Sequence, residues 1–346
     1  MTRTMKTLIY NGPWDMTLDD LPRPEPGDRD ALLAVQAVGI CGSDVHGFTG
    51  ESGRRAPGMV MGHEVVGQVS VLGSDVTGLN VGDHVAIFNV IGCGQCMYCR
   101  TEQPQRCAQR RVLGVNAGRW GAMAEFLAFP ADGLFVINPT VDPTLGLLAE
   151  PIGVATHAVR RADAQAGQSA AVVGAGMIGN ALVIALNRSG VDPVFAVDII
   201  PERLELARAY GAVPIQANES NPEAIIRDAL GGEGTDLAFE AVGSAQTVRA
   251  AFELLRIGGT LTLVGNLAKE FTLPLQGVTD RETTIRGSYG FTKQDFADAV
   301  ALINDNELDL EPLISDTCSL EQTPMVMTEL AKGTRSALKV VIRPQT

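Results

Sequence analysis

Hydrophobic and polar positions divide the chain into a β-rich first part and a later part in which strands and helices alternate. In the first part, short apolar runs bounded by Gly and Pro predict strands over residues 6–10, 30–38, 64–72, 82–88 and 134–137. The segment 122–129 is compatible with a helix or a strand. Residues 22–27 are proline-rich and predict a loop, because proline cannot pair within a central strand. This part is predicted to be an antiparallel β domain.

A helix predicted over 144–166 leads into the alternating part. Strand-like runs occur at 169–173, 194–198, near Val213, and at 236–242, 259–264 and 283–288, and helix-like runs at 181–187, 201–210, 222–230 and 247–255. Repeated strand–helix units predict an α/β fold with a doubly wound parallel sheet. The remaining residues predict helices over 295–303 and 325–330, then a strand over 337–342.

A glycine-rich motif, Gly174-Ala-Gly-Met-Ile-Gly179, lies between the first of these strands and its helix. In this context G-x-G-x-x-G indicates dinucleotide binding. Asp198 ends the next strand, 24 residues after Gly174, where a carboxylate binds the adenosine ribose hydroxyls of NAD. We expect Arg203 to lie beside the adenine or to pair with Glu202. The alternative is a domain of the same fold that binds no nucleotide.

Composition narrows the class of protein. A length of 346 residues suits two domains, and a net charge of −13 argues against a nucleic-acid surface, which needs clustered Lys and Arg. No apolar run approaches the ~20 residues of a membrane helix, and the first residues lack a signal-peptide pattern. We therefore expect a cytoplasmic protein. In that compartment the six cysteines are expected to be metal ligands or free thiols rather than disulfides.

Four cysteines form a compact motif. Cys93, Cys96, Cys99 and Cys107 are separated by two, two and seven residues. Four thiolates without an open position make a structural zinc site. The alternative is an iron–sulfur cluster, but the bacterial cluster motif has a last gap of three residues followed by proline. Cys318 is isolated and is expected to be a buried apolar thiol.

A second group of residues offers the ligands of a catalytic metal. Cys41 supplies a thiolate, His63 an imidazole and Glu64 a carboxylate, which together can hold zinc with one position left open. Ser43 and His46 follow Cys41 by two and five residues. A hydroxyl and an imidazole so placed could carry a proton between the metal site and water.

These motifs resemble one enzyme family. The stretch Gly39-Ile-Cys-Gly-Ser-Asp-Val-His46, the sequence Gly62-His-Glu64, the four-cysteine spacing and Glu150-Pro151 are similar to the zinc-dependent medium-chain dehydrogenases. The similarity is greatest to the polyol and threonine dehydrogenase branches, and it covers essentially the whole chain.

The resemblance implies a domain organisation. Residues 1–155 and 291–346 would form a GroES-like catalytic domain with a structural zinc lobe at about 90–110, and residues 156–290 a Rossmann NAD-binding domain. The active site would lie in the cleft between the domains. Members of this family are dimers or tetramers, so we expect a homotetramer, with a dimer as the alternative. The candidate edge for pairing is the strand 283–288.

The resemblance also assigns residues. Cys41 and His63 would bind the catalytic zinc together with Glu64 or Glu150, and Asp44 would orient His63. The residues expected to contact NAD are Gly174, Gly176, Met177, Ile178, Gly179, Asp198, Arg203, Val242, Gly265, Ser288 and Tyr289. Candidates for the wall of the substrate pocket are Phe48, Trp120 and Tyr289.

The expected activity is interconversion of a secondary alcohol, a polyol or sugar derivative, with its ketone by hydride transfer. One alternative is a threonine-type β-hydroxy amino acid dehydrogenase. Sorbitol dehydrogenases typically carry Arg where this chain has Gly290, and threonine dehydrogenases share the Tyr-Gly sequence found here. An alternative from another class is a nucleotide-binding protein that keeps the fold without turnover.

Overall fold

The computed structural model describes residues 3–116 and 121–345. Trp120, a candidate for the pocket wall, lies outside the described residues. The chain forms two compact units. Unit 1 comprises residues 1–150 and 292–346, and unit 2 comprises residues 151–291.

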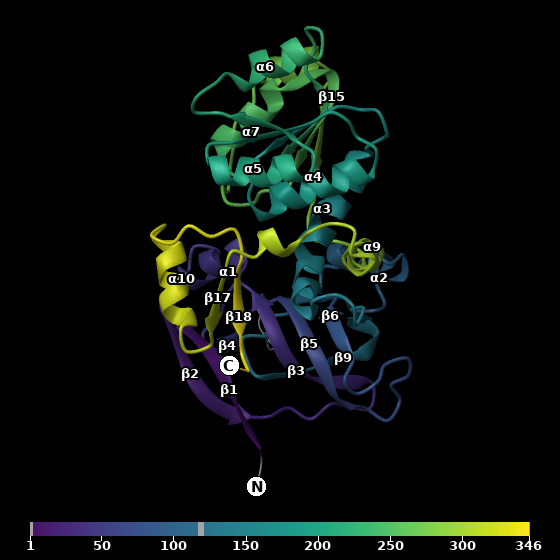
Figure 1. The fold of residues 1–346 in the computed structure, drawn as a ribbon, viewed down its shortest axis with the longest axis vertical. Coiled ribbons are helices and arrows are strands. Elements are labelled where there is room, and N and C mark those ends of the chain that lie inside the picture. Colours follow the sequence, from purple (N-terminus) through teal and green to yellow (C-terminus); the bar gives the residue numbers. More distant parts are fainter. Residues whose placement is uncertain (1–2, 117–120, 346) are drawn as a thin grey trace. The chain divides into compact units, whose positions relative to one another are not determined.

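Unit 1 is built mainly from two sheets. One has the strand order β2–β1–β4, and the other has the order β10–β6–β5–β3–β18–β17, with β9 also paired to β3. The strand bounds are β1 (Thr4–Gly12), β2 (Asp15–Pro22), β3 (Asp30–Gly39), β4 (Met59–Val60), β5 (Glu64–Leu72), β6 (His84–Ile87), β9 (Phe126–Pro130), β10 (Leu134–Val136), β17 (Asp316–Ser319) and β18 (Val340–Arg343). Figure 1 shows the yellow C-terminal strands beside the purple N-terminal ones.

The expectation of a purely antiparallel domain is wrong at one place. Strands β17 and β18 pair in parallel, whereas β18 pairs with β3 in the antiparallel sense. A parallel pair needs a crossover connection, and helix α10 (Thr323–Ala331) lies between the two strands in sequence. The segment 122–129, left open between helix and strand, contributes to strand β9.

The register of the large sheet explains where the candidate ligands lie. β3 pairs with β5 as far as Gly39 opposite Glu64. Buried residues of the two strands, among them Val38 and Val65, belong to one hydrophobic core and hold this register. The residues that follow β3 and those that precede β5 therefore meet at one end of the strand pair.

Several short elements were not predicted. They include helix α1 (Gly42–Phe48), helix α2 (Met97–Arg100), strands β7 (Val90–Ile91) and β8 (Arg111–Val112), and single 3-10 turns at Pro104–Arg106, Ala131–Gly133 and Glu311–Leu313. Strand β2 was also missed. Helix α1 is too short for a helical periodicity to be recognised. The predicted helix 144–166 is a 3-10 segment, Pro143–Leu148, followed by α3 (Ala149–Ala162).

Unit 2 contains the predicted parallel sheet. Its strand order is β13–β12–β11–β14–β15–β16, and every pair is parallel. The bounds are β11 (Ala170–Val173), β12 (Val194–Asp198), β13 (Val213–Gln216), β14 (Thr235–Glu240), β15 (Leu255–Leu263) and β16 (Thr284–Gly287). The strand order reverses between β11 and β14, which is where ligands bind in doubly wound sheets.

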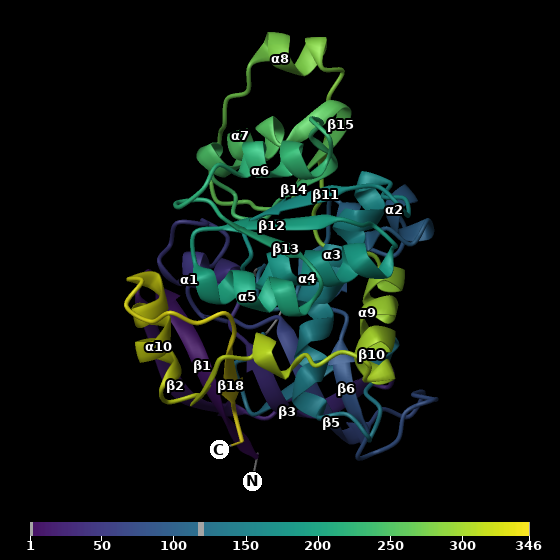
Figure 2. The same ribbon diagram turned by 45° about the horizontal axis from the view of Figure 1, so that its top comes forward.

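Helices cover both faces of this sheet. Figure 2 shows α4 and α5 over one face and α6 and α7 over the other. The bounds are α4 (Met177–Arg188), α5 (Pro201–Ala209), α6 (Pro222–Ala229), α7 (Ala245–Glu253) and α8 (Leu275–Asp280). Helix α9 (Lys293–Asp305) belongs to unit 1. In the part of the chain that the structure describes, every helix is too short or too polar to cross a lipid bilayer.

Candidate active site and metal centres

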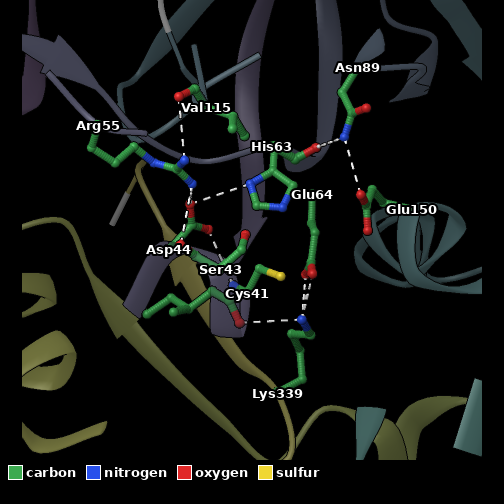
Figure 3. A network of polar contacts seen from close by, with 11 residues as sticks. Cys41, Ser43, Asp44, Arg55, His63, Glu64, Asn89, Val115, Glu150 and Lys339 are labelled. Carbon is green, nitrogen blue, oxygen red and sulfur yellow. Dashed lines mark hydrogen bonds and ion pairs between the residues drawn. The ribbon is translucent and has the colours of Figure 1, made fainter. Parts of the chain in front are cut away.

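The side chains of Cys41, His63 and Glu64 converge in unit 1. One ligand atom of each lies within 4.8 Å of the other two, and Figure 3 shows the three side chains pointing toward one another. Cys41 caps the start of α1, and Glu64 begins β5. A Cβ atom on Gly39 would overlap the Glu64 carboxylate, so the close approach of the two strands requires glycine there. A thiolate, an imidazole and a carboxylate at this spacing fit a zinc ion.

Glu150 lies outside this group of three. Its Oε1 atom is 3.4 Å from Nδ2 of Asn89, which also donates a hydrogen bond to the His63 carbonyl oxygen at 3.0 Å. Burial raises the pKa of Glu150 to about 7, with His63 opposing the shift and Glu64 adding to it. The structure therefore places Glu64 with Cys41 and His63, and places Glu150 beside Asn89.

A buried lysine next to Glu64 was not recognised in the sequence. Lys339 Nζ lies 2.7 Å from Glu64 Oε1 and 2.6 Å from Oε2, and it donates to the Ile40 carbonyl at 3.2 Å. Burial acts to lower the pKa of Lys339, but Glu64 and Cys41 outweigh it and raise the pKa. A single lysine in the apolar run 337–342 was the available signal, since a buried charge requires a partner.

Asp44 supports His63 from the other side. Its Oδ1 atom lies 3.3 Å from His63 Nδ1 and accepts a hydrogen bond from Arg55 Nη2 at 2.9 Å, and its Oδ2 atom accepts from the Cys41 backbone at 3.3 Å. Asp44 is fully buried. Burial acts to raise its pKa, but His63 and Arg55 lower the pKa of Asp44 to about 2. Asp44 is thus a carboxylate beside His63, as expected.

The two residues assigned to proton transfer lie on α1. His46 Nδ1 is 3.0 Å from Glu51 Oε2, and the imidazole is 37% exposed. His46 and Cys41 both border an open hollow of about 410 Å³, whose lining also includes Trp14, Glu51 and Leu338. Ser43 is exposed and is not in that lining. The geometry therefore gives His46 access to water and to the hollow beside Cys41.

The four-cysteine motif forms a separate cluster. The sulfur atoms of Cys93, Cys96, Cys99 and Cys107 all lie within 4.8 Å of one another. Backbone N–H groups of Gln95 and Cys96 lower the pKa of Cys93 to about 6, which favours the thiolate that binds metal. Four convergent sulfur atoms fit a tetrahedral structural zinc.

The glycine motif occupies the turn between β11 and α4 in unit 2. Gly174 has φ +96°, and a Cβ atom on Gly179 would overlap the Gly174 carbonyl oxygen. Met177 and Ile178 begin α4 immediately after Gly176. The turn therefore needs glycine at these positions, and it brings the helix start against the sheet as in dinucleotide-binding folds.

Asp198 is held by three backbone groups. Its Oδ2 atom accepts from Ala175 N at 2.7 Å, and its Oδ1 atom accepts from Ile199 N at 2.7 Å and Ile200 N at 3.0 Å. Arg203 Nη1 lies 3.8 Å from Asp198 Oδ2. Arg203 thus contacts Asp198 rather than the expected Glu202, and a position of its guanidinium beside the adenine stays a prediction.

The other expected cofactor residues follow neighbouring strands. Val242, Gly265 and Ser288 come shortly after β14, β15 and β16, and Tyr289 follows Ser288 with 44% exposure. Glu240, fully buried at the end of β14, was not recognised in the sequence. Its Oε1 atom accepts from Val242 N at 2.9 Å, Gly243 N at 2.7 Å and Thr247 Oγ1 at 2.7 Å. Glu240 therefore fixes the loop after β14.

Protein purified without a chelator is expected to contain about two zinc ions per chain, one for each convergent group. Elemental analysis measures this directly. Iron with visible charge-transfer absorption would instead support an iron–sulfur cluster at the four cysteines.

Comparisons with known proteins agree with this architecture. The family model of the alcohol dehydrogenase GroES-like domain matches residues 27–139, and that of the zinc-binding dehydrogenases matches residues 178–305. These matches confirm the expected GroES-like and Rossmann parts.

Relatives match over nearly the full length. D-xylulose reductase A of Aspergillus oryzae is 32% identical over 94% of this chain and 94% of its own. Sorbitol dehydrogenase of Bacillus subtilis is 29% identical over 99% of this chain and 98% of its own. A zinc-binding dehydrogenase of Sinorhizobium meliloti bound to NADP superposes with a TM-score of 0.89 at 27% identity, covering 99% and 100% of the two chains. The chain therefore belongs to the zinc-dependent medium-chain dehydrogenases, an oxidoreductase family, within their polyol branch.

Proposed function

We propose that this protein interconverts a secondary alcohol, a polyol or sugar derivative, with the corresponding ketone, using zinc and NAD. The observation that carries the proposal is the convergence of Cys41, His63 and Glu64 on one point, with ligand atoms within 4.8 Å of one another. A group of this kind leaves one zinc position open for a ligand from outside the chain. Relatives named D-xylulose reductase and sorbitol dehydrogenase support a polyol substrate.

The residues of the site have distinct tasks. Cys41, His63 and Glu64 would hold the zinc, which when bound supplies a Lewis acid that lowers the pKa of an alcohol hydroxyl. Lys339 balances the charge of Glu64 in a buried environment. We assign to His46, which contacts Glu51 at 3.0 Å and is partly exposed, the transfer of a proton from the site to water. We also assign Ser43, which is exposed on the same helix, to that path.

NAD is the proposed cofactor because of the glycine motif and Asp198. The carboxyl edge of the sheet, with Gly174 at one strand and Val242 at the next, forms the proposed site. All six cysteines are free of disulfides, and two zinc sites that depend on thiolates suit a reducing compartment. We therefore also propose a cytoplasmic location.

The test is cofactor reduction across a panel of alditols, aldoses, diols and threonine, followed at the nicotinamide absorption band. We expect the highest kcat/KM with a polyol or a vicinal diol. Gly290 has φ +59°, a conformation that disfavours arginine at this position, so we expect the pocket to differ there from that of the sorbitol dehydrogenases. A clear preference for threonine would favour the amino acid dehydrogenase. Absence of turnover with every substrate, in protein that contains both zinc ions, would favour the non-catalytic alternative.

We expect a homotetramer, with a dimer as the alternative, and light scattering measures the mass. β16 is an edge strand, and Ile285 on it is 41% exposed. Ile257 on the neighbouring strand β15 is 66% exposed and Leu275 at the start of α8 is 78% exposed, which favours coverage by another copy. Ile285→Lys should lower the mass, whereas Val81→Lys, at a 65% exposed site in unit 1, should not. A wild-type monomer at micromolar concentration would contradict this expectation.

A further inference from the structure

Arg55 is a buried arginine in the loop between α1 and β4, and the site chemistry above does not use it. Its side chain is 2% exposed. The guanidinium joins two segments that are far apart in sequence. Nη2 donates to Asp44 Oδ1 at 2.9 Å and to the Ser43 carbonyl at 3.4 Å, and Nη1 donates to the Val115 carbonyl at 3.3 Å. In Figure 3 Asp44 bridges Arg55 and His63.

The helix next to Arg55 is shaped to receive it. A Cβ atom on Gly47 would lie 2.7 Å from Arg55 Cγ and 3.0 Å from Nε. A side chain at position 47 would therefore require Arg55 to move. The Arg55 side chain therefore packs against α1 in a defined position, and its contacts are not those of a mobile surface side chain.

We propose that Arg55 is a positioning residue for the zinc site, holding Asp44 where its Oδ1 atom faces His63 Nδ1, so that His63 Nε2 is free to bind the metal. The inference rests on the zinc site of the proposed function. It concerns a residue that touches neither the metal nor the substrate.

The physical reason is the negative charge of Asp44, which a neutral, metal-bound histidine does not balance. A histidine that binds zinc is a neutral imidazole, and its second nitrogen donates to an acceptor that fixes the ring. Asp44 is the residue that would accept from it, because its Oδ1 atom lies 3.3 Å from His63 Nδ1 and the residue is 0% exposed. The zinc ion would act on Asp44 only across the imidazole, whereas Arg55 is in direct contact with the buried carboxylate at 2.9 Å and offers a planar and rigid donor group. Without it, Asp44 would lose the contact that keeps Oδ1 directed at His63.

The test measures metal release. Arg55→Met keeps the aliphatic stem and removes the guanidinium, and the matched control is Arg54→Met at the exposed neighbouring arginine. Zinc release into a chromophoric chelator is followed for both ions of the wild type and the variants. Partners of metal-bound histidines affect metal affinity about 10- to 100-fold. Arg55 contacts the partner of the histidine rather than the histidine itself. We expect Arg55→Met to release one of the two zinc ions at least ~10-fold faster than the wild type. The other ion and both ions of Arg54→Met should be released at wild-type rates.

Two further measurements separate positioning from a general loss of structure. The cobalt-substituted Arg55→Met variant should show a changed visible spectrum at the site of faster release. The double variant Asp44→Asn/Arg55→Met should release metal no faster than Asp44→Asn alone, because Arg55 acts through Asp44. If Arg55→Met does not fold, Arg55→Lys replaces it, since the contacts with Asp44 and Val115 are made by two separate guanidinium nitrogens and a lysine side chain has only one nitrogen. It should release the same ion about threefold faster or more.

Unchanged release with an unchanged cobalt spectrum would overturn the inference, in Arg55→Met or in the lysine variant that replaces it. Equal acceleration at both zinc sites would also overturn it, because that outcome indicates general destabilisation. A wild type that binds only the four-cysteine zinc would instead refute the proposed active site, so the two failures are distinguishable.

Discussion

Replacing Cys41 by serine, or His63 by alanine, is expected to abolish alcohol oxidation while cofactor binding stays nearly intact. Each variant removes one of the three ligands that converge in unit 1. Loss of a Lewis acid worth several kcal/mol lowers kcat by about a thousandfold or more, since each ~1.4 kcal/mol is a factor of ten. The proposed cofactor residues belong to unit 2, so titration with NADH, followed by the fluorescence of its reduced nicotinamide, should show little change in cofactor affinity.

Two cysteine variants serve as controls for this experiment. Cys318→Ser removes a buried thiol that lies outside both metal groups, and turnover should persist. Cys96→Ser should mainly lower stability or assembly, because it disrupts the structural cluster. If Cys41→Ser is as active as the wild type, the assignment of the catalytic zinc is wrong.

NAD is expected to be preferred over NADP by at least ~10²-fold in kcat/KM. Asp198 ends β12, where it would accept the ribose hydroxyls of NAD and face the additional phosphate of NADP. Two like charges about 4 Å apart repel by about 4 kcal/mol at an effective dielectric constant near 20, before any relaxation. The backbone donors of Ala175, Ile199 and Ile200 hold the carboxylate in place, so it cannot easily turn away from a phosphate.

We expect the preference for NAD over NADP to persist although Arg203 lies nearby. Arg203 lies 3.8 Å from Asp198, so its charge is already engaged by the carboxylate. Asp198→Ala should lower the ratio of kcat/KM with NAD to kcat/KM with NADP, chiefly by weakening the binding of NAD. Steady-state kinetics with both cofactors measures this ratio. Glu205→Ala, on the same helix and 67% exposed at its side chain, is the matched control and should leave the ratio unchanged. Equal efficiency of the wild type with NAD and NADP would refute the argument.

The features that could be predicted from the sequence are those whose residues lie close together along the chain. The predicted bounds of β5 and β12 are those of the structure, because β5 is a valine-rich run between Glu64 and Leu72 and β12 is a continuous apolar run that ends at Asp198. The four-cysteine group was predictable because its ligands lie within a short stretch of chain. The turn between β11 and α4 was predictable because glycine is required by its geometry.

Contacts over long sequence distances could not be predicted in this way. Lys339 and Glu64 are separated by 275 residues, and only the pairing of β18 with β3 brings them together. Arg55 reaches Val115 across 60 residues, and neither residue belongs to a motif. Such pairs depend on strand register and on loop paths, which a pattern of apolar residues does not specify.

The pairing of β18 with β3 also sets an order of events during synthesis. Residues 151–291 form a continuous unit that can fold as soon as it leaves the ribosome. Glu64, by contrast, is translated 275 residues before the lysine that neutralises it. Because β18 is the strand between β3 and β17, the large sheet of unit 1 cannot close until nearly the whole polypeptide has been made. The nascent chain therefore carries Cys41, His63 and Glu64 through most of translation with the sheet beside them still open at β3.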